Sequence, residues 1–440
     1  MTDDEIGRLY ALLRVPSVSA LPRHADDMLR AAHLVADEIR LAGGAADVRT
    51  STARPLVVGD VPASTGAGVP RVIIYGHYDV QPVGDVALWH SDPFEPVVRD
   101  GNLYARGASD DKGNLFMLLV AVQRLAAEGR LPVNVTFLVD GEEEVSGTSA
   151  LDWVRDEAPD AVASIIFDTA MAAPQYPVVC SGLRGLIYRR VRVRTAEGDA
   201  HSGIYGGAAL NAAHALVQIL EAIRPHDGRL HPDLYAGLAE ATPDETRAWG
   251  TLPTGADLLA GQGLVRADPA AAREFYARTL AEPSLDVHAL HCGEPDAVKT
   301  NLPSRASATL SVRLAPGQDH VAIGAALERI IHSAAPEGAS VEVEELSHAE
   351  ATLIDPATPA LEATRDAIAR STGWPCVPLR VGGSIPVAAT FAQRGIPPVL
   401  TGFGLPDDQI HAPNERLREA HLEIGAVAAM EILTALGGPA

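Results

Sequence analysis

Short apolar runs alternate with helical periodicity through the first half of the chain, and this alternation constrains the fold more than any other feature. Residues 72–75, 135–139 and 165–167 are apolar enough to form buried strands. Between the first two, apolar side chains recur at helical spacing from Leu115 to Ala126, and Gly129 follows as a stop signal. Strands separated by helices in this way predict an α/β fold with a mixed, mostly parallel sheet between helices.

The second half of the chain follows a different pattern. Three segments alternate between apolar and polar side chains, as strands with one solvent-exposed face do: residues 190–194, 310–314 and 341–344. Helical patterns lie between them at 208–223 and 319–334, and together these elements predict a smaller two-layer α+β unit. The segment 224–290 is rich in Pro, Gly and Asp and supports no clear prediction.

The last part of the chain returns to the first pattern. A helix is expected from about residue 351, then a strand at 398–400, then a final helix from about Glu415 with Asn414 as its cap. We therefore expect a large discontinuous domain that is interrupted by a smaller one. The expected bounds are 1–182 and 351–440 for the large domain and 183–350 for the inserted domain.

Length and composition narrow the class of protein. The chain has 440 residues, about three times the ~150 residues of a typical domain, so more than one domain is expected. A hydrophobic content of 47% with 21% charged residues excludes a disordered chain. The net charge of −22 disfavours nucleic acid and anionic membrane as partners. No apolar stretch is long enough to cross a bilayer.

The N-terminus and the cysteines both predict a cytoplasmic protein. The opening residues, MTDDEIGRLYALL, are acidic where a secretion signal is basic. Cys180, Cys292 and Cys376 are few and widely spaced, which indicates free thiols in a reducing compartment.

Histidines and carboxylates gather where the predicted strands end. His77 and Asp79 follow the first strand, Asp110 precedes the strong helix, residues 142–144 (Glu-Glu-Glu) follow the second strand, and Asp168 ends the third. Active sites of open α/β sheets lie at the carboxyl ends of the strands, so we expect these groups to converge. A converging set of imidazole and carboxylate ligands predicts a metal site.

Neighbouring residues in these groups can take separate roles, one as a metal ligand and the other as an orienting group or proton acceptor. His77 would bind a metal while Asp79 orients its ring, and adjacent glutamates would supply one ligand and one proton acceptor. Taken singly, a His-x-Asp pair or an acidic turn is more often structural. The ligand set favours zinc, manganese or cobalt over calcium, and neither a Gly-x-Ser-x-Gly elbow nor a phosphate-binding loop occurs.

These motifs resemble a family of co-catalytic zinc peptidases. The family includes carnosinase-type dipeptidases, acetylornithine deacetylase, succinyl-diaminopimelate desuccinylase, aminoacylase and carboxypeptidase G, and the carnosinase type is the most similar. The resemblance covers nearly the whole chain. The matching segments are YGHYDVQP (75–82), DPFEPVVRDGNLYARGASDDKG (92–113), DGEEEVSG (140–147), Asp168, AHSGIYGG (200–207), VKTNLPSRASATLSVRL (298–314), RVGGSIP (380–386) and HAPNE (411–415).

The resemblance implies two divalent metal ions in each subunit, zinc first and manganese or cobalt as alternatives. His77, Asp110 and Asp168 would hold one ion. Asp110, Glu144 and His411 would hold the other, so that Asp110 bridges the pair. The resemblance also implies a cis peptide bond between Asp110 and Asp111.

Catalytic and substrate-binding roles come from the same resemblance. Glu143 matches the general base, Asp79 the acid that orients His77, and His201 a group that stabilises the reacting carbonyl. Four positions match substrate-binding residues: His201, Thr300, Arg313 and Ser384. The resemblance places His201 and Thr300 in the partner's site, which implies a homodimer formed through an inserted lid and dimerisation domain.

The expected activity is therefore hydrolysis of a small amide, most simply a dipeptide. An N-acyl-amino-acid deacylase with the same site is the enzymatic alternative, and a catalytically idle metal-bound binding protein is the alternative from another class. Glu142, the Ser146-Gly147 order and Thr169 depart from the carnosinase-type pattern and leave the exact substrate open. The three cysteines match no ligand position and are expected to be buried or inert.

Overall fold

The computed structural model describes residues 1–440 except 65, 67, 294–298, 384 and 439–440. The chain divides into two compact units. Unit 1 comprises Met1–Ser181, Ile354–Leu379 and Val387–Ala440, and unit 2 comprises Gly182–Leu353 and Arg380–Pro386. Within the described part of the chain, no helix is both long and apolar enough to cross a membrane.

Unit 1 is built on a six-stranded sheet in the order β1-β2-β6-β3-β7-β17. Four strands, from β6 to β17 in that order, are parallel, and β1 and β2 add an antiparallel hairpin at one edge. This arrangement confirms the predicted α/β class. The strands are β1 (Ala45–Arg49), β2 (Leu56–Val61), β3 (Arg71–His77), β6 (Asn134–Asp140), β7 (Ala163–Phe167) and β17 (Pro398–Thr401).

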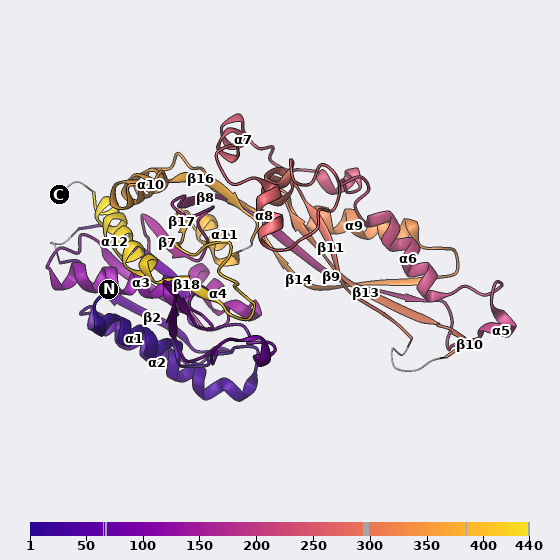
Figure 1. Cartoon of the computed structure of the whole chain (residues 1–440), viewed down its shortest axis with the longest axis horizontal. Helices are drawn as coiled ribbons and strands as arrows, with labels where there is room; N and C mark the ends of the chain where they lie inside the picture. The colour runs from indigo at the N-terminus through magenta and orange to yellow at the C-terminus, as the bar shows by residue number, and fades with distance from the viewer. Residues whose placement is uncertain (65, 67, 294–298, 384, 439–440) are drawn as a thin grey trace. The chain divides into compact units, whose positions relative to one another are not determined.

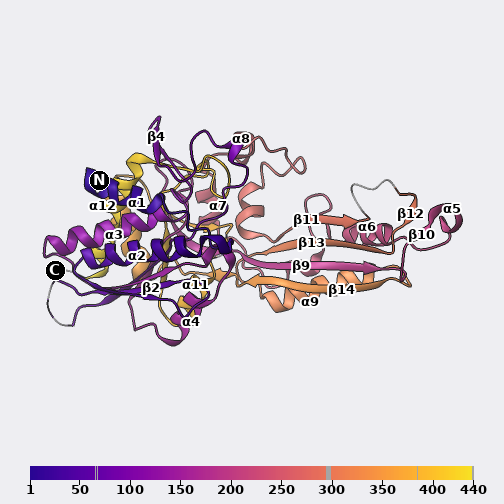
Figure 2. The same cartoon turned by 90° about the horizontal axis from the view of Figure 1, so that it is seen from below.

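Helices cover both faces of this sheet. From β3 the chain crosses to β6 on one side and then to β7 on the other, and right-handed crossovers therefore place α3 and α4 on opposite faces (Figure 2). Helix α3 is buried along most of its length because α1, α2 and α12 pack over it. The helices are α1 (Asp3–Leu13), α2 (Ala25–Leu41), α3 (Lys112–Ala127), α4 (Ser149–Asp156), α10 (Pro359–Thr372), α11 (Pro386–Gln393) and α12 (Glu419–Leu436), with short 3-10 turns η1 (Pro22–His24), η2 (Val86–Leu88) and η3 (Glu143–Val145).

The start of the final helix differs from the sequence-based expectation. It begins at Glu419 rather than near Glu415, and strand β18 (Arg416–Arg418) precedes it. Asn414 has a φ of 65°, a left-handed conformation, and does not cap the helix. Strand β18 instead joins a small sheet with β4 (Val97–Arg99) and β5 (Asn102–Tyr104). Residues 411–415 therefore form a loop before β18 and do not belong to the final helix.

Unit 2 consists of a four-stranded antiparallel sheet with two helices on one face (Figure 1). The strand order is β11-β13-β9-β14. Alternate residues such as Val191, Leu310 and Val312 pack with Ile219 and Leu327 of the helices, in agreement with the period of two. These elements are β9 (Gly185–Arg194), β11 (Ser284–Cys292), β13 (Arg305–Leu314), β14 (Ser340–Ala349), α6 (Ala212–Ile223) and α9 (His320–Ala334).

Shorter elements complete the chain. Strands β8 (Val178–Leu183) and β16 (Val377–Val381) each contain a boundary between the units. The segment 224–290, for which no element is predicted, holds short helical turns and the first residues of β11. The remaining elements are β10 (Ala200–His201), β12 (Asn301–Leu302), β15 (Thr352–Leu353), α5 (Ser202–Tyr205), α7 (Pro243–Trp249), α8 (Gly255–Gly261), η4 (Pro232–Tyr235) and the π-helical turn η5 (Ala277–Ala281).

The compact units place residues 380–386 with unit 2, whereas the sequence pattern predicts them in the larger domain. The expected bounds of 1–182, 183–350 and 351–440, and the lid and dimerisation roles, remain predictions. Among the cysteines, Cys180 and Cys376 are buried, but Cys292 is exposed at the end of β11.

Candidate metal centre

Three neighbouring parallel strands deliver the candidate ligands to one edge of the unit 1 sheet. His77 is the last residue of β3 and pairs in register with Asp140 at the end of β6. The next turn of the chain after β6 carries the three glutamates, and Asp168 follows directly after β7. Because β3 lies between β6 and β7, the sheet brings these candidate residues to one place.

The first candidate ligand group contains His77, Asp110 and Asp168, whose ligand atoms all lie within 4.8 Å of one another. His77 Nε2 lies 3.0 Å from Asp110 Oδ1 and 4.0 Å from Asp168 Oδ1. The side chain of His77 is only 1% exposed. One imidazole and two carboxylates therefore point at a common, sheltered position.

The second group contains Asp110, Glu144 and His411, again within 4.8 Å. His411 Nε2 lies 2.9 Å from Asp110 Oδ2 and 3.3 Å from Glu144 Oε2. Asp110 thus belongs to both groups and turns a different carboxylate oxygen to each histidine. This is the arrangement a carboxylate needs to bridge two cations.

Electrostatics show that the residues fit divalent cations. Burial, together with the charges of neighbouring carboxylates, raises the pKa values of Asp168 and Glu143 well above their usual range. Hydrogen bonds to Asp110 and Glu144 raise the pKa of His411 to about 10. Buried carboxylates that repel one another are stabilised by a bound cation, and the nitrogen and oxygen donors suit a borderline transition metal.

Asp79 makes two different contacts with its neighbours. Its backbone carbonyl oxygen lies 3.0 Å from His77 Nδ1, whereas its carboxylate Oδ1 lies 3.4 Å away from the same atom. Its other carboxylate oxygen, Oδ2, accepts a hydrogen bond from the backbone N–H of Glu144 at 3.2 Å. Asp79 therefore touches the ring of one candidate ligand and the backbone of another, and both its backbone and its side chain take part.

The three glutamates after β6 have separate surroundings. Glu142 is buried and accepts a hydrogen bond from the backbone N–H of Ser149, at the start of α4. Glu144 belongs to the second ligand group, and Gln81 Nε2 donates to its Oε2 at 2.8 Å. Glu143 belongs to neither ligand group, although burial and the charges of Asp168 and Glu144 raise its pKa. Among the described residues, only the Glu143 carboxylate of these three has no hydrogen-bond or ion-pair partner.

Glu415 is a residue of the centre that sequence reasoning missed. Its buried carboxylate accepts hydrogen bonds from the backbone N–H groups of Gly107 (3.0 Å), Ser109 (2.9 Å) and Asp110 (3.1 Å). Arg106 Nη1 donates to it at 2.7 Å, and both side chains are at most 1% exposed. Glu415 therefore fixes the loop that presents Asp110. Glu415 belongs to the HAPNE segment (411–415) that matches the family, but a glutamate before an amphipathic stretch also fits the start of a helix.

The Asp110–Asp111 peptide bond is cis, as the resemblance implied. Asp111 Oδ2 accepts a hydrogen bond from the backbone N–H of His77 at 3.1 Å. A Cβ atom at Gly76 would approach the same oxygen to 2.8 Å, so a larger residue there would displace the Asp111 carboxylate.

Replacing Arg106 by Met should destabilise the protein by about 3–5 kcal/mol, because the Glu415 carboxylate would stay buried without its partner. Urea unfolding followed by tryptophan fluorescence would measure the shift. Arg14→Met is a matched control, since Arg14 and Glu95 form an exposed ion pair at 2.6 Å and its loss should move the midpoint little. Equal shifts in the two variants would contradict a stabilising role for the buried pair.

Unit 2 brings some of the predicted substrate-binding residues together and separates others. His201 in β10 pairs with Asn301 in β12, and the backbone oxygen of Thr300 accepts hydrogen bonds from Ser202. His201 and Thr300 therefore lie close to each other, near the start of β13. Arg313 lies near the other end of β13, about 27 Å along the strand from Arg305. Ser384 lies outside the described residues.

Comparisons with known proteins agree on one family. Residues 73–435 match the family model described as peptidase family M20/M25/M40. The cysteinylglycine-S-conjugate dipeptidase of Corynebacterium striatum is 30% identical over 98% of this chain and 94% of that protein. The beta-Ala-His dipeptidase of Homo sapiens is 27% identical over 93% of this chain and 85% of that protein.

A solved structure shows the same fold. The metallo-carboxypeptidase Sso-CP2 from Sulfolobus solfataricus superposes with a TM-score of 0.87, covering 99% of this chain and all of that one, at 24% identity. The α/β architecture described above is therefore that of these peptidases.

Proposed function

Because the chain belongs to peptidase family M20/M25/M40, it is a hydrolase that acts on peptide bonds, and we propose that it is a two-metal dipeptidase. The observation that carries this proposal is the position of Asp110. One of its oxygens lies 3.0 Å from His77 Nε2 and the other 2.9 Å from His411 Nε2. The names of the two curated relatives, both dipeptidases, support the choice of substrate class.

The two ligand groups assign residues to two divalent ions. His77, Asp110 and Asp168 would hold one ion, and Asp110, Glu144 and His411 would hold the other. Zinc is proposed first because its ligands are typically imidazole nitrogen and carboxylate oxygen, with manganese or cobalt as alternatives. When bound, such ions polarise a scissile carbonyl and make water more acidic.

Glu143 is proposed as the general base. Its carboxylate accepts a proton from the attacking water and passes this proton to the nitrogen of the leaving amine. Burial and the charges of neighbouring carboxylates raise its pKa, which makes this carboxylate a stronger base than that of an exposed glutamate. Asp79 is proposed to hold the ring of His77, and His201 to donate a hydrogen bond to the carbonyl oxygen as negative charge develops there.

Contacts at both ends of the substrate are proposed to set its length. Arg313 and Ser384 would bind its terminal carboxylate, because a guanidinium group can donate two parallel hydrogen bonds to a carboxylate. Asp168, a member of the first ligand group, favours a substrate with a free ammonium group, because a neutral acyl group gains nothing next to carboxylates. A substrate fixed at both ends in this way has about two residues.

The homodimer is part of the same proposal. His201 and Thr300 lie near one end of β13 and Arg313 near the other, so one copy of unit 2 does not gather all three around one substrate. A second copy that contributes His201 and Thr300 removes this difficulty. Exposed apolar side chains on α5, α6 and β11 support an interface on unit 2: Ile204, Tyr205, Val217 and Leu290. A cytoplasmic location also belongs to the proposal and is supported by the three cysteines, none of which forms a disulfide among the described residues.

Removing the metals should abolish dipeptide cleavage, because no ion would then be bound to polarise the scissile carbonyl or to make the attacking water more acidic. We expect the chelator-treated protein to regain activity with zinc, manganese or cobalt at about two ions per chain. Metal content measured by atomic absorption, beside hydrolysis of a dipeptide panel, would check this. Full activity of a metal-free protein would contradict the proposal.

A further inference from the structure

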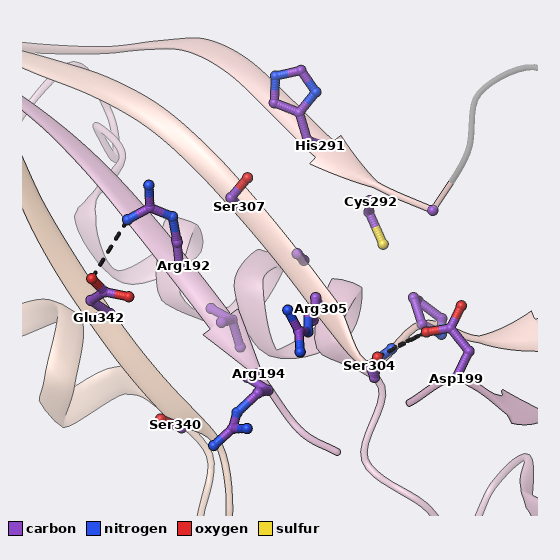
Figure 3. Close-up of a pocket in the computed structure, with 14 residues that line it drawn as sticks. Arg192, Arg194, Asp199, His291, Cys292, Ser304, Arg305, Ser307, Ser340 and Glu342 are labelled. Carbon is purple, nitrogen blue, oxygen red and sulfur yellow. Dashed lines mark hydrogen bonds and ion pairs between the residues drawn. The ribbon is translucent and has the colours of Figure 1, made fainter. Parts of the chain in front are cut away.

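An open groove of about 710 Å³ lies at one end of the unit 2 sheet, and none of its lining residues is a candidate metal ligand (Figure 3). It is lined by the last residues of β9 and β11 and the first residues of β13 and β14. Val193 and Ala306 point into the helix-covered core, so alternation directs Arg192, Arg194 and Arg305 to the uncovered face of the sheet. The volume lies in the range of small-molecule sites.

Strand register brings the three arginines together. Arg305 of β13 lies directly opposite Arg194 of β9, and Arg192 lies two residues further along β9. Directly opposed residues have Cβ atoms about 5 Å apart, and residues two apart on one strand are about 7 Å apart. Three guanidinium groups can therefore reach one ligand. The chain as a whole has a net charge of −22, so three neighbouring arginines are a local concentration of cationic side chains.

The charges of Arg194 and Arg305 are only partly compensated. Like charges directly opposite each other destabilise a sheet, and Arg194 and Arg305 are such a pair. Arg194 forms an ion pair with Glu197, whose side chain is 89% exposed. Within the part of the chain that the structure describes, the guanidinium group of Arg305 has no ion-pair or hydrogen-bond partner. Figure 3 shows Arg305 between Arg194 and Ser304 with no contact drawn to it.

The acidic residues of the groove are already engaged. Asp199 accepts hydrogen bonds from Ser304, through both the backbone N–H and the hydroxyl at 2.9 Å, and from Asn301. Glu342 lies 3.6 Å from Arg192 Nη1, and Glu344 lies 2.7 Å from Arg192 Nη2. Arg192 is thus shared with two carboxylates, while Arg194 and Arg305 keep donors for a ligand.

We propose that this groove binds a small molecule that carries two or more neighbouring anionic groups. Guanidinium forks bind phosphate and carboxylate alike, so an oligophosphate and a tricarboxylate share the required chemistry. Ser304 and Ser307 line the same groove and add hydroxyl groups. The site uses none of the residues assigned to peptide hydrolysis and does not depend on the proposed dipeptidase function.

Cys292 provides a local reporter for the test. It lines the groove and is exposed, whereas Cys180 and Cys376 are buried. The full-length, metal-loaded protein would be titrated with tripolyphosphate and, separately, with citrate, at constant ionic strength. We expect saturable binding by calorimetry and, in parallel, slower alkylation of Cys292. The probe that binds more tightly identifies the phosphate or the carboxylate class.

Matched variants separate groove binding from chelation of the catalytic metals. Arg305→Gln and Arg194→Gln should each weaken binding at least about tenfold, since each removes a charge-assisted hydrogen bond. Arg190→Gln is the control, because Arg190 is on the same strand and bonds Glu344 at 3.0 Å but does not line the groove. The proposal would be overturned by equal binding in all variants or by the absence of saturable binding. It would also be overturned if Cys292 did not react in the absence of a probe, or if a probe did not slow its alkylation.

Discussion

Replacing Glu143 by Gln should lower kcat about 10²–10⁴-fold, the contribution usually ascribed to general acid–base catalysis, while both metals stay bound. The structural reason is that Glu143 belongs to neither ligand group, although it lies among their carboxylates. Glutamine keeps the shape of the side chain but cannot accept the proton of the attacking water. Steady-state kinetics and metal content on the same preparation would measure the two effects separately.

Glu144→Gln is the matched control for this substitution. Glu144 is the neighbouring residue and its Oε2 lies 3.3 Å from His411 Nε2, so its variant should bind the second metal more weakly. If the Glu143 variant loses metal while the Glu144 variant keeps it, the two roles are reversed. If the Glu143 variant keeps both its metal and its activity, another group acts as the base.

Two inactive variants should regain activity when mixed. His201→Ala removes a group of unit 2, and Glu143→Gln removes a group of unit 1. In a mixed dimer, one site then has an intact Glu143 from its own chain and an intact His201 from the partner chain. Random mixing should restore about a quarter of the wild-type activity, because half of the dimers are mixed and each contains one intact site.

A second mixture tests whether the recovery arises from shared sites. Glu143→Gln and Asp168→Asn both alter unit 1, so their mixed dimer has a defect in each site and should stay inactive. Mass spectrometry of differently tagged chains would verify that mixed dimers form. Inactivity of verified His201 and Glu143 mixed dimers would show that His201 does not act across the dimer.

Local patterns in the sequence predict those parts of the centre that lie next to buried strands. The strands that end at His77, Asp140 and Phe167 carry continuous apolar runs, and such runs are typical of buried strands. The ligands follow those strands within a few residues, so the edge of the sheet where they meet is predictable. The pattern also offered Asp110, before the strong helix, whereas its bridging role and the ligand His411 came only from the resemblance.

Contacts that join distant loops are not predictable in this way. Glu415 contacts the backbone of residues 107–110, about 300 positions earlier, and no periodicity reports such a pairing. A polar residue before an amphipathic segment favours a helix cap, and this preference predicts Asn414 as a cap. The left-handed backbone of Asn414 and the pairing of β18 with β5 override that preference.

The sequence does not predict that the groove arginines lie together, and the reason is different. The pattern of residues 190–194 (RVRVR) predicts a strand with a solvent-exposed face, and such a strand is present. The direct opposition of Arg194 and Arg305 depends on the register between two strands about 110 residues apart. Register is a tertiary property that the pattern of one strand does not contain.

Comparison of free and N-acetylated substrates tests the central proposal most directly. The metal-loaded protein would be given a broad panel of unblocked dipeptides, their N-acetylated counterparts, C-terminally amidated dipeptides and N-acetyl amino acids. We predict a higher kcat/KM for the unblocked dipeptides than for either modified form, because Asp168 favours a free ammonium group and Arg313 a free carboxylate. Faster turnover of N-acetyl amino acids than of every unblocked dipeptide would contradict a dipeptidase and establish a deacylase with the same metal centre.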